Sequence, residues 1–297
     1  MIVYLDQNKW IELAKMFHGK DNSIRASRVL REYEEARKDN RIQLPLSSIH
    51  YIETSRISNT NRRVRLGAAM WHFSGGASII GYQAIVRHEL ELALAKHLTE
   101  VNPGSINILG RGHAHAFCSP PLPGAMALIQ DEIERSLLMG SAWLGIDPLA
   151  SYSSTHRENF KQHLSTLHVR CKAVPENLRE NWLYAMSTDD ILNPLNEVMR
   201  KHKLPKETIA NLGEHRLKEV IDDMPTRRID MHLHKQILQN PNYVARSSDL
   251  EDWGGIAVAS SYCDVVICEK HMADMLRRNR FTTYARIETN IENTFNA

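Results

Sequence analysis

The chain has 297 residues, of which 42% are hydrophobic and 24% charged, proportions typical of a folded protein with a full apolar core. The formal net charge is +2, which excludes nucleic-acid binding through bulk charge, so any phosphate contact requires a local basic patch. The four cysteines match neither a zinc knuckle nor a disulfide framework, and no stretch approaches the roughly 20 apolar residues of a membrane span. With no leader pattern before the first strand, we expect a cytoplasmic protein with no membrane partner.

The first 60 residues alternate between strand and helix patterns. The predicted elements are a strand over residues 2–5, a helix that ends at Gly19, a helix over 23–38, a strand over 42–46 and a helix capped by Ser47 or Ser48. This order is typical of an α/β sheet with crossover helices.

The central part of the chain has a mostly helical pattern. Helices are predicted over residues 61–73, 82–98, 125–144, 157–171, 175–186, 190–201 and 206–221. We interpret 61–225 as a large helical insertion that binds substrate or a partner, and 1–60 with 226–297 as the core.

The last segment returns to an α/β pattern. The predicted elements are helices over 229–238, 250–260 and 270–277, and strands over 264–268 and 282–287. Gly254, Gly255, Ala257 and Ala259 indicate a helix that packs closely against the sheet, although a merely flexible helix is the alternative.

Four acidic residues stand at element ends or on a helix beside a strand: Asp6, Glu53, Asp252 and Glu269. Asp6 and Glu269 each follow a strand, and the ligand crevice of an open parallel sheet lies outside the carboxyl ends of its strands. We therefore expect these acids to converge. For any one of them, a helix cap or a solvated loop residue is the competing interpretation.

Gathered carboxylates repel one another, so the cluster predicts a hard divalent cation, Mg²⁺ or Mn²⁺. Such a cation orients water for attack on phosphorus, which makes a phosphodiester the expected substrate. Asp249 lies one helical turn before Asp252 and is a further candidate ligand. Asp264 is expected to orient backbone rather than to bind metal.

The run SSDLEDWGGIAVASSYCDVVICEK resembles the PIN-domain family of metal-dependent nucleases. In that family an acid ends the first strand, another lies in an early helix, a third starts a late small-residue helix, and a fourth ends the hydrophobic strand that follows. Those features fall on Asp6 in IVYLDQNKW, Glu53 in PLSSIHYIETSR, Asp252 in DLEDWGGIAVA and Glu269 in YCDVVICEK. Glu269 departs from the family pattern, where aspartate is more usual, and its longer side chain would shift the metal or require a bridging water.

The resemblance implies a PIN-like parallel sheet flanked by helices and endonucleolytic hydrolysis of RNA. It makes Asp6 and Asp252 the leading metal ligands, with Glu53 and Glu269 as direct or water-mediated ones. A toxin or phage-defence role, with an inhibitor or antitoxin protein as partner, follows only by analogy at the level of the fold. Whether the chain forms a homodimer stays open.

Basic residues near the predicted acids are candidates for phosphate contacts: Lys9, Arg56, Arg62, Arg63 and Arg65. A solvated surface is the alternative for each. Two histidine pairs, His113 with His115 and His232 with His234, are given structural roles, although the first pair could share an ion if GHAHAF were extended.

The sequence therefore favours a metal-dependent endoribonuclease. A PIN-fold scaffold without catalysis is an alternative, motivated by the Glu269 departure. A structure-specific DNA nuclease is another, which the near-neutral charge disfavours because such an enzyme needs a broad basic surface.

Overall fold

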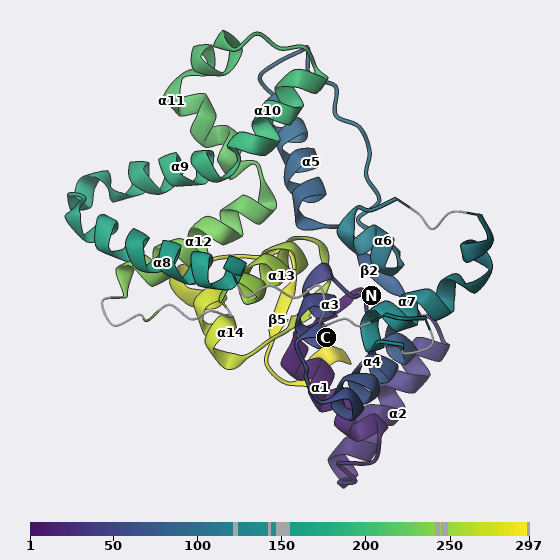
Figure 1. Cartoon of the computed structure of the whole chain (residues 1–297). Helices are drawn as coiled ribbons and strands as arrows, with labels where there is room; N and C mark the ends of the chain where they lie inside the picture. The colour runs from purple at the N-terminus through teal and green to yellow at the C-terminus, as the bar shows by residue number, and fades with distance from the viewer. Residues whose placement is uncertain (121–123, 142–143, 147–154, 241–243, 245–248, 296–297) are drawn as a thin grey trace.

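The computed structural model describes residues 1–120, 124–141, 144–146, 155–240, 244 and 249–295 (Figure 1). Its architecture is mixed α/β, with many helices around a small parallel sheet. None of the helices in the described ranges carries an apolar run of the length that a bilayer requires.

The sheet consists of three parallel strands in the order β1 (Val3–Leu5), β4 (Val265–Ile267) and β5 (Arg286–Glu288). On the free edge of β1, parallel bridges join Ile2 to Gln43 and Leu46 to Ser78, so the sheet continues there without regular strands. The segments that follow β1 in the sequence thus lie on one side of it, and β4 and β5, from the last part of the sequence, lie on the other side. The strand order reverses between β1 and β4, which is where open α/β sheets bind their ligands.

The helices of the first half are α1 (Gln7–Phe17), α2 (Ile24–Lys38), α3 (Ser48–Ser55), α4 (Thr60–Ser74), α5 (Tyr82–Ala95), α6 (Gly112–Phe117) and α7 (Gln130–Met139). Those of the second half are α8 (Thr155–Ala173), α9 (Arg179–Asp190), α10 (Leu192–Lys201), α11 (Glu207–Asp222), α12 (Pro225–Gln239), α13 (Asp249–Tyr262) and α14 (Lys270–Arg277). Short 3₁₀ helices cover Gly124–Ile129, Glu176–Leu178, Arg278–Arg280 and Ile291–Phe295.

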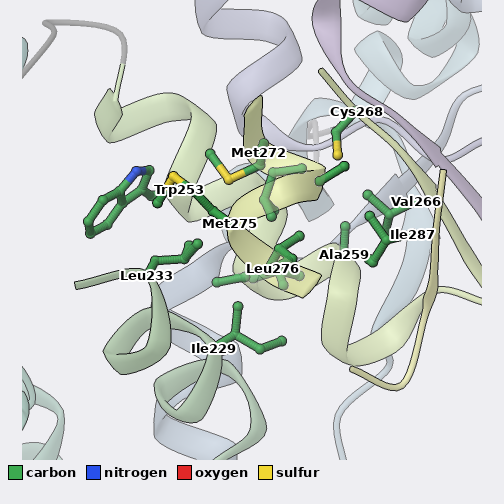
Figure 2. Packing of buried hydrophobic residues seen from close by; sticks show 14 of the residues in the cluster. Ile229, Leu233, Trp253, Ala259, Val266, Cys268, Met272, Met275, Leu276 and Ile287 are labelled. Atoms are coloured by element: carbon green, nitrogen blue, oxygen red, sulfur yellow. The ribbon is translucent and has the colours of Figure 1, made fainter. Parts of the chain in front are cut away.

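The alternation of side chains along β1 divides the interior into two apolar clusters. Val3 and Leu5 point into a cluster formed with α1, α2 and α4, whereas Tyr4 points into one formed with α12, α13 and α14. Figure 2 shows the second cluster, in which residues from three helices pack against one face of the sheet: Ile229, Leu233, Trp253, Ala259, Met272, Met275 and Leu276. Helices therefore cover both faces of the sheet.

A third cluster lies away from the sheet and joins α5, α10 and α11 (Figure 1). Other parts of the 61–225 segment enter the two sheet clusters, for example Met70 and Phe73 of α4 and Leu164 and Leu167 of α8. The central segment is thus partly a lobe with its own packing and partly a cover for the sheet.

Most predicted helices agree with the structure to within a few residues, and the helix over 270–277 coincides with α14. The strand predicted over 42–46 forms only isolated bridges. The antiparallel pair β2 (Ala77–Ile79) and β3 (Leu109–Arg111) is absent from the sequence prediction, and the helix predicted over 206–221 is broken at Gly213, where φ is 75°.

Candidate active site

Asp6 immediately follows β1 and caps the first helix. Its backbone N–H donates to the Ile267 carbonyl at 2.9 Å, and its carboxylate accepts the N–H of Gln7 at 2.9 Å. An acid at this position satisfies one of the free N–H groups at the start of α1. The same geometry holds the carboxylate at the carboxyl edge of the sheet.

Glu269 lies two residues after the end of β4 and is the N-cap residue of α14. Because β1 and β4 are parallel, with Leu5 paired to Ile267, Asp6 and Glu269 emerge at the same edge, as predicted from the sequence. The side-chain amide of Asn8 donates to the Glu269 carboxylate and so orients it toward the start of α1. The two acids flank the point where the strand order reverses.

The pKa of Asp6 is raised to about 6, chiefly because burial disfavours the charged form. The N–H of Gln7 lowers this pKa, the negative charge of Glu269 raises it further, and Lys9 lowers it. Asp6 therefore carries a charge that its surroundings only partly compensate. A cation between the two acids would relieve that imbalance.

Tyr4 connects Asp6 to the third predicted acid, Glu53 on α3. Its hydroxyl is buried, and the distance from Tyr4 Oη to Ser47 Oγ is 3.3 Å. The pKa of Tyr4 is well above its usual value, mainly because of burial and further because of the negative charges of Asp6 and Glu53. The negative charges of both carboxylates thus contribute to the raised pKa of the same phenol. Glu53 also has interactions of its own within the fold.

The helix α13 reaches this phenol as well. A Cβ atom added to Gly255 would lie 2.5 Å from Tyr4 Oη and 3.7 Å from Ile49 Cγ1, so only glycine permits the approach. Asp252 precedes Gly255 by three residues on the same helix, and Asp249 begins it. The side chains of Asp249 and Asp252 lie outside the described residues, so their predicted role as ligands stays a prediction.

Trp253 fixes the first part of α13 against α12. Its indole is buried and lies edge-on to the ring of His234, with the ring centroids 4.7 Å apart. His234 in turn pairs with the carboxylate of Asp230, one turn earlier on α12, at 3.5 Å. This packing holds the helix that carries Asp252 against α12.

His50 is a component of the site that the sequence interpretation missed. Its Nδ1 accepts the N–H of Ser47 at 2.9 Å, and its Nε2 therefore carries the proton and donates to the Leu5 carbonyl at 2.8 Å. Burial lowers the pKa of His50 to about 4, which keeps the ring neutral. The spacing of Ser47 and His50, a cap residue and the third residue of its helix, is the available sequence signal.

Gln7 adds a second link between α1 and α3. Its side-chain amide donates to Thr54 Oγ1 at 3.1 Å, beside Glu53 in the sequence. With the His50 contact, this bond holds the Glu53 helix against the end of β1.

The predicted phosphate ligands divide into different environments. Arg63 is buried, and its guanidinium donates to the carbonyls of Ile57 and Met139, so its expected contact with phosphate is not supported and its role is to hold α4. Arg62 and Arg65 are exposed on α4, and Lys9 pairs with Glu12 at 3.6 Å. Arg56 is half-buried at the end of α3 and has partners within the fold.

The histidine pairs have structural contacts, as expected. GHAHAF forms α6 rather than an extended segment, so His113 and His115 do not share a face. His113 stacks on Phe117 at 4.2 Å, and His232 donates to the Met275 carbonyl at 2.9 Å. Asp264 accepts the N–H of Ile2 at 2.6 Å and so orients backbone, as expected.

The described residues offer the kind of ligand that a hard cation prefers, but only a small number of them. Asp6 and Glu269 offer carboxylate oxygens at one edge, which is the chemistry that Mg²⁺ and Mn²⁺ prefer. Among the described side chains, which leave out those of Asp249 and Asp252, no three acidic, imidazole or thiol groups lie close enough together to hold a metal. Completion of the site would therefore depend on the first turn of α13.

This arrangement brings two carboxylates to the edge between β1 and β4, a third to the same buried phenol, and a helix that begins with two more acids against it. In comparisons with known proteins, the chain matches no protein-family model, no curated protein and no solved structure.

Proposed function

We propose that the chain is a PIN-like, divalent-metal-dependent endoribonuclease whose reaction takes place at the edge between β1 and β4. The single observation that carries this proposal is the pairing of Asp6 and Glu269 after adjacent parallel strands, at the reversal of strand order. The raised pKa of Asp6 adds to it, because perturbed carboxyl groups in such crevices are candidates for functional roles.

In this proposal Asp6, Glu269 and Asp252 hold Mg²⁺ or Mn²⁺, and Glu53 acts through a bridging water, because Asp6, Glu269 and Glu53 do not lie close enough together to bind one ion directly. The bound cation would supply Lewis-acid assistance to the hydrolysis of a phosphodiester. Asn8 keeps the Glu269 carboxylate aimed at the site, and His50 fixes the carbonyl of the residue before Asp6. Both contacts place the acids before substrate arrives.

The test is cleavage of labelled single-stranded RNA by wild type and by Asp6→Asn, in EDTA, Mg²⁺ and Mn²⁺. Asparagine caps helices about as well as aspartate, so the variant keeps the α1 cap and loses only the charge. We expect metal-dependent cleavage by wild type and a loss of at least about 100-fold in the variant, since loss of a contact one step from a metal already reduces activity about 10- to 100-fold.

Asp21→Asn is the matched control, because Asp21 is also an acid that accepts a nearby backbone N–H but lies away from the sheet edge. This variant is expected to cleave like wild type. Equal cleavage by wild type and Asp6→Asn would overturn the proposal. Cleavage of DNA but not RNA would instead support the DNA nuclease, and absence of both cleavage and calorimetric Mn²⁺ binding would support the scaffold.

A further inference from the structure

The outer face of α14 carries basic residues at both of its ends. The buried side of this helix consists of Met272, Ala273, Met275 and Leu276, which pack into the cluster of Figure 2. Lys270, His271, Asp274 and Arg277 are exposed on the other side. Asp274 is the only acidic residue in the segment 270–280, against four lysines and arginines.

The helix ends in a turn that presents two arginines to solvent. Within the described residues, Arg278 and Arg280 have neither an ion pair nor a side-chain hydrogen bond, and both are exposed. The flanking arginines differ, since Arg277 donates to the Ile287 carbonyl and Arg286 donates to the Thr294 carbonyl at 2.9 Å. Arg277 and Arg286 thus make hydrogen bonds within the fold, whereas the side chains of Arg278 and Arg280 are available to a ligand.

The backbone of this turn adopts a conformation that residues with side chains disfavour. Asn279 has φ 57° and Arg280 has φ 56°, the left-handed region that generally favours glycine. Such conformations persist only where their surroundings enforce them, and they concentrate at functional sites. The surroundings of this turn therefore hold Arg280 in a backbone conformation that costs free energy.

Phe281 fixes the turn to the body of the protein. Its ring stacks on that of His232, with the two ring centroids 4.0 Å apart. The guanidinium of Arg228, which like His232 belongs to α12, lies 6.0 Å from the centroid of the Phe281 ring. Three residues later, Tyr284 has 72% of its surface exposed. The turn at residues 278–280, which carries the two arginines, is thus followed closely in the sequence by an exposed aromatic ring.

The same helix joins this turn to the candidate active site. Glu269 caps the start of α14 and Arg278 follows its end, so the eight residues between them separate the two points by about 12 Å. We propose that Lys270, His271, Arg278, Arg280 and Tyr284 form a binding surface for single-stranded RNA that leads from the site along α14. This inference rests on the proposed function, because it takes RNA as the substrate.

The chemistry of the surface supports a single strand. Guanidinium groups pair with phosphates, and exposed aromatic rings stack on unpaired bases, a combination typical of single-strand binding. The surface also supplies the local basic patch that a chain of formal charge +2 needs in order to bind a polyanion.

The experiment measures fluorescence anisotropy of labelled oligo(U) in EDTA, with Asp6→Asn as the parent protein so that no cleavage intervenes. We expect Arg278→Ala with Arg280→Ala to weaken binding at least tenfold and to reduce the slope of log affinity against log salt by about 1.4, or about 0.7 for each lost phosphate contact. Tyr284→Ala should weaken binding at least about fivefold and leave that slope unchanged, because stacking is not ionic.

The control variant, Arg28→Ala with Arg31→Ala, removes the same charge from α2, which packs on the opposite face of the sheet. It should bind like the parent. The inference would be overturned if the Arg278/Arg280 variant bound RNA with the same affinity and salt slope as the parent, or if the α2 control lost as much affinity as that variant. Absence of RNA binding by the parent would overturn it as well.

The two proposals can fail separately. If wild type cleaves RNA in a metal-dependent way but the arginine variant binds normally, the nuclease stands and this surface does not. If the arginine variant loses binding but no cleavage occurs with any metal, the surface stands as an RNA contact and the nuclease proposal falls.

Discussion

Asp6 serves two purposes that make different demands on its side chain. The cap of α1 requires an oxygen that accepts the N–H of Gln7, and an asparagine oxygen would do this equally well. The negative charge is not needed for the cap, and both burial and Glu269 disfavour it. Gln7 and Lys9 compensate this charge only in part, and under the proposed function a bound cation would compensate the rest.

The variant Asp6→Asn should consequently be more stable than wild type at neutral pH. Because the pKa of Asp6 rises from 3.8 to about 6 on folding, the folded state holds the proton more tightly, and stability falls as pH rises through that window. Removing the charge should increase the free energy of unfolding by about 1 to 3 kcal/mol at about pH 7.5, and by much less at about pH 4.5. Urea denaturation at both pH values measures this difference.

Asp21 provides a control of opposite sign. Its pKa is lowered, chiefly by the backbone N–H of Ser23, so its charged form favours the folded state. At the higher pH, the free energy of unfolding of Asp21→Asn should therefore not exceed that of wild type. If Asp6→Asn were less stable than wild type at the higher pH, the Asp6 charge would be structural and the argument for a cation would lose its basis.

At the scale of elements, the position of α13 depends on one glycine of an adjacent pair. Gly255→Ala places a methyl group 2.5 Å from Tyr4 Oη and should reduce the free energy of unfolding by about 1 to 3 kcal/mol. Gly254→Ala meets no atom within 4 Å and should instead increase it by about 0.5 to 1 kcal/mol through helix propensity. Chemical denaturation of the two variants checks this contrast.

The phenol oxygen can be tested directly as the cause of the clash. Combining Gly255→Ala with Tyr4→Phe removes the atom that the new methyl group meets, so the double variant should recover part of the loss. Additive effects of the two substitutions would mean that α13 does not depend on this contact.

Helices were the most predictable elements because their apolar residues recur at a constant spacing over many residues. The helix predicted over 23–38, which agrees with α2 to one residue, and the bounds of α14 follow from such patterns. The strand pair β2 and β3 could not be predicted, since three residues such as Ala77–Ile79 carry too little periodicity. The segment after Ile42 has a strand pattern, but its neighbours offer only isolated bridges.

At the scale of the whole molecule, the buried carboxylate of Glu89 joins the central helices to the last part of the chain. It accepts the N–H of Thr226 at 3.1 Å and the hydroxyl of Tyr262 at 2.6 Å, which connects α5 with the start of α12 and the end of α13. Burial raises the pKa of this carboxyl group, and hydrogen bonds from Thr226 and Tyr262 oppose the rise. One side chain thus links three distant segments.

Glu89→Ala should lower the free energy of unfolding by about 2 to 4 kcal/mol, because it leaves the buried donors of Thr226 and Tyr262 without an acceptor. Glu89→Gln should lose less, since its carbonyl oxygen still accepts. Glu100→Ala, at an exposed position, is the control and should change stability little. Denaturation that did not distinguish Glu89→Ala from Glu100→Ala would show that the link contributes nothing.

The sequence predicted which acids end strands, and hence that Asp6 and Glu269 share an edge, because strand direction alone determines that outcome. It did not predict His50, Tyr4 or Glu89 as organising residues. Their roles depend on contacts between segments, such as His50 with the Leu5 carbonyl, that no local pattern encodes. Arg63 was misassigned for the same reason, since its burial follows from the packing of α4.

The pairing of β1 with β4 also determines when the site can exist. Val3 pairs with Val265, Ile2 donates to Asp264 and Asn8 donates to Glu269. Part of the surroundings of Asp6 therefore comes from residues that are synthesised long after it. At roughly 5 to 20 residues per second, the ribosome completes that segment on the order of ten seconds to a minute after Asp6 has been synthesised. A nascent chain therefore carries Asp6 for most of this interval without its partners from β4, so the edge between β1 and β4 is the last part of the sheet around Asp6 to form.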